Sequence, residues 1–171
     1  MGNWCYAILG GDNEFEFLMD FAEKMGFEFP ESPEDYDDSL QKYVLLNASK
    51  GPCRANLEAL SEKALFEYLA QKDANDHILP VAASLYMAAG AKIPPRLVHE
   101  SLFWAEEPTQ PEDDESLEEF EDRVETWLST WVSQDKRKAR LKTFANFLRA
   151  YDGTPLTEEA IDEIVGLDDK D

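Results

Sequence analysis

The sequence has few cysteines, no long apolar run and few basic side chains, and each shortage excludes a class of protein. Only Cys5 and Cys53 occur among 171 residues, too few for the disulfide framework of a small secreted domain. No stretch approaches the roughly 20 apolar residues of a membrane-spanning helix. The N-terminus lacks the basic start of a secretory signal. We therefore expect a cytoplasmic protein.

The shortage of basic residues leaves a large negative charge. Acidic side chains outnumber basic ones by 37 to 16, and the formal net charge is -21. Nucleic-acid backbones and anionic membranes both attract lysine and arginine, so this composition disfavours both as partners. A basic protein is the complementary partner. The simpler explanation is that the acids keep the chain soluble.

Apolar residues recur at helical spacing along most of the chain. The spacing predicts a helix over Glu14–Met25, where Gly26 supplies a C-terminal stop. It predicts another over Leu117–Trp131, preceded by the capping-box pair Ser116 and Glu119. Since strands and helices do not alternate, we do not expect a parallel α/β sheet. We predict one domain over residues 1–171, an all-α or mainly α compact bundle of six to eight helices.

Other segments add detail to this bundle. Residues 54–72 are expected to form one amphipathic helix, and residues 75–90 a helix that is apolar nearly all round and therefore central. Residues 39–47 fit a helix better than a strand, and the strand stays open. The N-terminus is expected to form an extended arm, and its pairing with another short segment into a small sheet is the alternative. The other two segments are a mobile acidic loop over 106–115 and a frayed acidic tail over 167–171.

The apolar faces of these helices define an expected core. We expect these side chains to be buried because each lies on the apolar stripe of its segment. The predicted core residues are Phe17, Leu18, Phe21, Leu65, Leu69, Leu85, Leu102, Phe120, Leu128, Phe144 and Leu148.

The opening of the chain resembles an uncharacterised bacterial family, a domain of unknown function whose members begin with Met-Gly-x-Trp. An acidic pair and an amphipathic helix follow in that family, and the alanine-rich residues 81–89 are also similar to it. The chain departs from the family at Cys5, where glycine is usual, and at Gly11, where asparagine is usual. The resemblance implies no activity and no site residue. The matching residues are Met1, Gly2, Trp4, Asp12, Phe17 and Leu18.

Two cysteines and two histidines are the candidate metal ligands. Neither pair has the short spacing of a zinc site, and no HExxH helix occurs. We therefore expect no metal and no cofactor. Cys53 beside Arg54 is a candidate for a lowered thiol pKa. An enzyme or small-molecule site built from scattered residues is the alternative function, and its candidates are Cys53, His77, His99 and Trp104.

The sharpest contrast in charge lies between two neighbouring segments. Residues 106–125 hold eleven acids and one arginine, whereas residues 136–142 hold five basic residues. We expect the two segments to neutralise each other across a hairpin. The preferred function is a non-enzymatic interaction protein, of the immunity, inhibitor or mimic kind, that binds a basic partner. The expected binding residues are Glu112, Asp113, Asp114, Glu115, Glu118, Glu119 and Asp122.

Overall fold

The computed structural model describes residues 12–29, 40–72, 78–106, 108–130 and 135–165. These residues form nine α-helices and no strand, so the all-α prediction is confirmed and the predicted six to eight helices were too few. The helices are α1 (Asp12–Lys24), α2 (Leu40–Asn47), α3 (Cys53–Ala59), α4 (Glu62–Gln71), α5 (Ile78–Ala89), α6 (Pro95–Ala105), α7 (Leu117–Thr130), α8 (Asp135–Ala150) and α9 (Glu158–Val165).

The additional helix arises because the segment expected over residues 54–72 is broken. Leu60 has φ -77° and ψ 120°, an extended conformation that ends α3. The Ser61 hydroxyl then accepts a hydrogen bond from the Ala64 N–H at 3.1 Å and caps α4. A serine in a helical pattern therefore begins a new helix here instead of continuing the old one.

Several helix ends agree with the sequence signals. Gly26 has φ +88° and follows α1, where the Phe27 N–H bonds back to the Ala22 carbonyl at 2.9 Å. The Ser116 hydroxyl accepts from the Glu119 N–H at 3.1 Å, which confirms the capping box. Residues 40–47 form a helix, as preferred.

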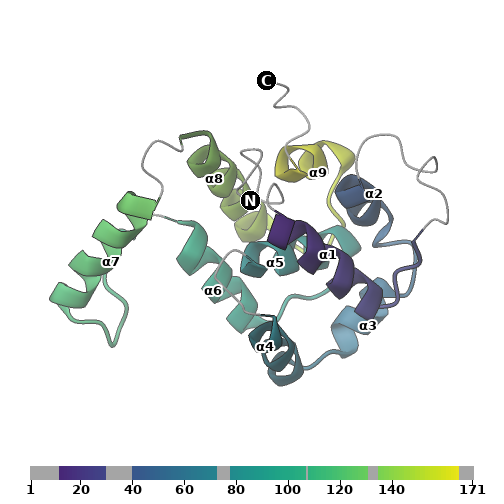
Figure 1. The fold of residues 1–171 in the computed structure, drawn as a ribbon, viewed down its shortest axis with the longest axis horizontal. Helices are drawn as coiled ribbons and strands as arrows, with labels where there is room; N and C mark the ends of the chain where they lie inside the picture. The colour runs from purple at the N-terminus through teal and green to yellow at the C-terminus, as the bar shows by residue number, and fades with distance from the viewer. Residues whose placement is uncertain (1–11, 30–39, 73–77, 107, 131–134, 166–171) are drawn as a thin grey trace.

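Helix α5 lies at the centre of the molecule, as its apolar sequence predicted. All its residues are buried. Helices α1, α2, α3, α6 and α8 pack around it (Figure 1). Its small alanine side chains let neighbouring helices approach closely, so one contiguous core forms around this helix.

The end of the chain closes the bundle. The Leu156 N–H donates to the Met87 carbonyl at 3.2 Å, which fixes the segment before α9 against the end of α5. Helix α9 then packs on α2 and α8. Lys42 of α2 pairs with Glu158 at 3.1 Å and with Asp162 at 2.9 Å.

Most of the predicted core is buried. Phe17, Leu18, Phe21, Leu65, Leu69, Leu85, Phe144 and Leu148 are confirmed. Three predictions were wrong: Leu102 and Phe120 are only half-buried, and Leu128 is 43% exposed. The two errors on α7 have one cause, because none of the helices that the structure describes packs closely over its apolar stripe.

Helix α7 stands apart from the other helices (Figure 1). None of its side chains that the structure describes is buried. Residues 108–116, which precede it, contain no helix or strand, in agreement with the predicted loop. The loop's mobility stays a prediction. Its end is a turn in which the Glu115 N–H donates to the Glu112 carbonyl at 3.0 Å.

Some predictions fall outside the described residues. These are the N-terminal arm, the ligand candidates Cys5 and His77, Trp131 at the expected end of α7, and the acidic tail over residues 167–171. Among the helices that the structure describes, none is both long and apolar enough to cross a bilayer.

Candidate functional site: the α7 arm and its two cavities

The base of α7 is held by one arginine. Arg123 forms a bidentate ion pair with Glu115 through hydrogen bonds of 2.8 and 2.9 Å. These hydrogen bonds lower the pKa of the Glu115 carboxyl and raise the pKa of the Arg123 guanidinium. Both side chains are largely shielded from solvent. The pair therefore fastens the turn before α7 to the helix itself.

Two contacts connect α7 to α6. The Arg123 guanidinium lies 4.4 Å from the centre of the Phe103 ring, a cation–π distance. One helical turn further on, the Trp127 indole N–H donates to the Trp104 carbonyl at 3.2 Å. This bond fixes the plane of the Trp127 ring against the end of α6.

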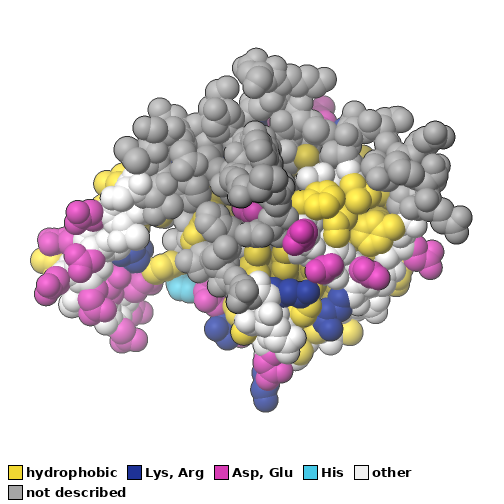
Figure 2. Space-filling model, viewed as in Figure 1, with side chains coloured by type: hydrophobic (Ala, Val, Ile, Leu, Met, Phe, Trp, Pro, Cys, Tyr) yellow, Lys and Arg dark blue, Asp and Glu magenta, His cyan; other side chains and the backbone are white. Residues whose placement is uncertain are grey.

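The outer side of α7 and its preceding turn is strongly acidic. In Figure 2, acidic side chains gather over the position that α7 occupies in Figure 1. Eight exposed acids form what we call the acidic face, and no ion pair joins any of them to a basic side chain that the structure describes. They are Glu112, Asp113, Asp114, Glu118, Glu119, Glu121, Asp122 and Glu125.

The structure places the seven predicted partner-binding residues in two different environments. Glu115 is half-buried and bonded to Arg123, whereas the other six residues of that set are exposed. A carboxylate already engaged in a bidentate pair is less available to a partner. Glu115 positions the turn that carries its acidic neighbours.

Apolar side chains border the acidic face. At about 100° per residue, Leu117, Val124 and Leu128 lie within roughly 40° of one another around α7. The arc beside them begins at Glu121 and contains the other acids of the helix. Leu117 is 65% exposed and Leu128 is 43% exposed. The outside of α7 thus combines negative charge with an uncovered leucine edge.

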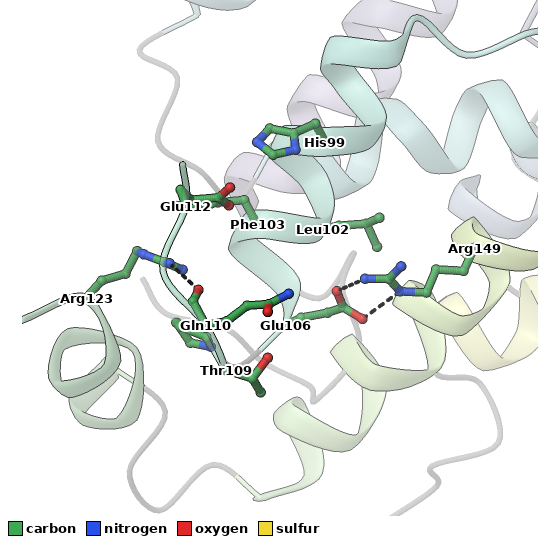
Figure 3. Close-up of a pocket in the computed structure, with 10 residues that line it drawn as sticks. His99, Leu102, Phe103, Glu106, Thr109, Gln110, Glu112, Arg123 and Arg149 are labelled. Atoms are coloured by element: carbon green, nitrogen blue, oxygen red, sulfur yellow. Dashed lines mark hydrogen bonds and ion pairs between the residues drawn. The ribbon is translucent and has the colours of Figure 1, made fainter. Parts of the chain in front are cut away.

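A polar cavity lies between α6 and the base of α7 (Figure 3). Its volume is about 310 Å³. In Figure 3 the Glu106 carboxylate and the Arg149 guanidinium point toward each other and form two hydrogen bonds, one of 2.9 Å. The side chains that line it include His99, Phe103, Glu106, Gln110, Glu112 and Arg123.

A second cavity, which we call the lysine cavity, has a volume of about 420 Å³ and lies where α6, α7 and α8 meet. Helix α8 contributes Lys138, Lys142, Ala145 and Arg149 to its lining. Their spacing places all four on one side of α8. The neighbouring side of that helix, about 100° around its axis, buries Leu141, Phe144 and Leu148 in the core.

The expected neutralisation between the acidic and basic segments is limited. Within the described residues, Glu106 pairs with Arg149, which lies beyond the basic segment. No described carboxylate lies within ion-pair distance of Lys138 or Lys142. Within the described residues, the two lysines therefore border the cavity without an acidic partner.

His77 of the alternative pocket lies outside the described residues, and the other three residues of that pocket are not gathered in one place. Cys53 is fully buried in α3, and its Sγ lies 4.0 Å from the Ala22 carbonyl oxygen of α1. Burial raises the pKa of the Cys53 thiol to about 11, opposite to the lowered pKa that its neighbour Arg54 suggested. His99 is exposed and lines the polar cavity. Trp104 is half-buried and accepts the Trp127 bond.

Among the described residues, no group of three or more histidine, cysteine, aspartate or glutamate side chains has the geometry to hold a metal ion. The lysine cavity was missed by sequence reasoning. Its signal was present as the recurrence of basic residues at 138, 142 and 149, the spacing of one helix face.

Comparison of the chain with known protein families, with curated proteins and with solved structures found no match. The resemblance to a bacterial family of unknown function therefore stays a prediction. Function has to be argued from the geometry of the site alone.

Proposed function

We propose that the protein is a non-enzymatic interaction protein that binds a basic protein partner through α7. The observation that carries this proposal is the position of the acidic face on a helix that stands apart from the body (Figure 1). A partner can approach such a helix without disturbing the core. A cytoplasmic location belongs to the same proposal.

The acidic face has the chemistry to attract and orient a basic surface. Eight exposed carboxylates concentrated on one arm add to the field of a chain whose net charge is -21. Fields of this kind raise association rates for partners of opposite charge and reject those of like charge. The charge supplies steering and orientation more than affinity.

Leu117 and Leu128, which form the leucine edge, supply the apolar contact area that the acidic face lacks. Leu117 and Leu128 lie about three turns apart along α7, or roughly 16 Å. Burial of exposed leucine side chains against a partner stabilises a complex by the hydrophobic effect. The expected partner therefore presents lysine or arginine side chains beside an apolar strip, and it has a net positive charge.

The test compares two variants that remove equal charge from different places. The first, Asp113→Asn, Asp114→Asn and Asp122→Asn, changes the acidic face without altering side-chain size. The second, Glu23→Gln, Glu67→Gln and Glu159→Gln, changes exposed acids on α1, α4 and α9. Both raise the net charge by the same amount, and neither removes an ion pair that the structure describes.

The partner is first isolated from the native host with the unmodified protein. Its association rate is then measured at low and physiological salt. The proposal expects the acidic-face variant to associate about tenfold more slowly at low salt, and the other variant to stay within about twofold of the unmodified protein. Equal losses in both variants would indicate a general effect of charge. No loss in either would exclude this face.

A further inference from the structure

We propose that the lysine cavity binds a small planar ring that carries a phosphate monoester. This inference is independent of the acidic face and concerns the inner side of α7, where it meets α6 and α8. The volume of about 420 Å³ lies within the range of roughly 300–1,000 Å³ that is typical of small-molecule sites. It is too small for a polymer.

The charges in the cavity favour a dianion. Among the lining residues that the structure describes, three cationic side chains, Lys138, Lys142 and Arg149, face one carboxylate, that of Glu106. Glu106 is bonded to Arg149, and no other described carboxylate forms an ion pair with either lysine. A phosphate monoester carries close to two negative charges at neutral pH. Its charge therefore matches the two lysines better than that of a carboxylate.

The charge of the cavity lining differs in sign from the net charge of the protein. The protein has a net charge of -21, yet the described lining of this cavity has more basic than acidic side chains. At physiological salt, interactions are screened beyond about 8 Å. The lysines that border the cavity consequently dominate the potential inside it, whereas the acids on the outside of α7 act mainly on approaching molecules.

One wall of the cavity is aromatic and fixed. The Trp127 ring lines it, and the bond from its N–H to the Trp104 carbonyl at 3.2 Å holds the ring in one orientation. A fixed indole ring offers a flat surface on which another ring can stack. Ala105 and Ala145 add small apolar surface. A planar group can therefore stack on this wall while the two lysines bind its phosphate.

Thr109 completes the polar lining. Its side chain belongs to the loop before α7, and it borders both cavities together with Glu106 and Arg149. A threonine hydroxyl can donate a hydrogen bond to a phosphate oxygen. The ligand would thereby contact the loop, α7 and α8 together.

The probe is phenyl phosphate, and the comparison ligands are inorganic phosphate, phenol and benzoate. Binding to the full chain is followed by NMR at pH 7.5 through the indole N–H of Trp127. We expect saturable shifts with a Kd of about 1 mM or lower. Each comparison ligand should bind at least about tenfold more weakly. Inorganic phosphate lacks the ring, phenol lacks the charge, and benzoate lacks the second negative charge.

The variant Lys138→Gln/Lys142→Gln should weaken phenyl phosphate binding by about tenfold or more. Both lysines are at least partly exposed, so the variant is expected to fold, and its circular dichroism checks this. Lys63→Gln on α4 is the control, because Lys63 is exposed and distant from the cavity lining. It should bind as the unmodified protein does.

Four results would overturn the proposal. The first is no saturable shift at 10 times the expected Kd. The second is equal binding of inorganic phosphate, which would indicate an ion held by lysines without a ring site. The third is equal binding of benzoate, which would remove the preference for a dianion. The last is unchanged binding by the double lysine variant.

Discussion

Helices α5 and α7 have similar lengths and opposite environments. Every residue of α5 is buried, and the helix has no charged side chain. No described side chain of α7 is buried, and six of its residues are charged. In the sequence, α7 shows an apolar stripe at helical spacing and α5 is apolar nearly all round, and of the two only α5 is surrounded by other described helices. Periodicity therefore identifies a helix and its apolar stripe, whereas burial depends on what other elements cover that stripe.

The difference also separates two roles. Helix α5 and the helices around it supply the free energy of folding through buried apolar surface. Helix α7 contributes little buried surface and carries the acidic face and one wall of the lysine cavity. Substitutions in α5 should therefore alter stability, and substitutions in α7 should alter binding.

The largest expected effect is the loss of a buried leucine from α5. Leu85→Ala should reduce the free energy of unfolding by about 2–5 kcal/mol, because Leu85 is fully buried and leaves a cavity. Leu128→Ala on α7 is the matched control and should change it by less than about 0.5 kcal/mol. Chemical denaturation measures both. Equal losses would mean that α7 is part of the core after all.

Thiol reactivity gives the second comparison. In a Cys5→Ser background, Cys53 should react with iodoacetamide at pH 8 about a hundredfold more slowly than a cysteine introduced by Leu128→Cys. Burial raises the pKa of Cys53 to about 11 and shields its sulfur, whereas an exposed thiol has a pKa near 8.5. Mass spectrometry follows the rates. Similar rates would show that the reagent reaches Cys53 as easily as a cysteine on α7. The core around α3 would then have to open readily.

A smaller effect is expected at the end of α5. The Tyr151 hydroxyl donates to the Ala91 carbonyl at 2.6 Å, whereas no described group bonds to the buried Tyr86 hydroxyl. Tyr151→Phe should therefore reduce the free energy of unfolding by about 1 kcal/mol.

Tyr86→Phe should leave stability unchanged or raise it slightly, since it removes an unsatisfied polar group from the core. Burial raises the pKa of both tyrosines to about 12, so neither effect should depend on pH below about 10. Thermal denaturation compares the two variants. A larger loss from Tyr86→Phe than from Tyr151→Phe would contradict the assignment of these hydroxyls.

The smallest expected effect concerns the base of α7. Because the pKa of Glu115 is lowered in the folded protein, its bond to Arg123 should persist above the ordinary glutamate pKa of about 4.3. The contribution of this ion pair to stability should be lost as the pH falls through the lowered pKa that Glu115 has in the folded protein. The NMR resonance of the Arg123 Nε–H group should move in that window.

Glu115→Gln provides the control for this titration, because it removes the ionisable group and should abolish the transition. A midpoint at or above the ordinary glutamate value in the unmodified protein would contradict the ion pair. The core resonances of α5 should not follow the same titration, which separates the arm from the body.

Much of the fold was predictable because its signals are local. The stop at Gly26, the capping box at Ser116 and the apolar composition of α5 all depend on neighbouring residues. The break at Leu60 was missed because the apolar residues keep helical spacing across Ser61, and that spacing outweighed the preference of serine for a helix cap. The exposure of Leu128 was missed because no local pattern shows whether another helix covers it, and none of the described helices does.

The candidate site was predictable only in part. The acidic segment was visible in the sequence, but the engagement of Glu115 by Arg123 depends on how the turn folds. The basic segment was also visible. Its assembly with Trp127 into a cavity requires α6, α7 and α8 to meet, and no local pattern specifies that meeting.

The contact between α2 and α9 has a consequence for synthesis of the chain. Lys42 lies near the beginning of the described residues, and its partners Glu158 and Asp162 lie near their end. A ribosome adds roughly 5–20 residues per second, so α2 waits several seconds for its partner helix to emerge. During that time the sides of α2 and α8 that α9 covers stay exposed. The bundle therefore closes only after α9 has been made, and a ribosome stalled before α9 would hold a chain whose core is incomplete on that side.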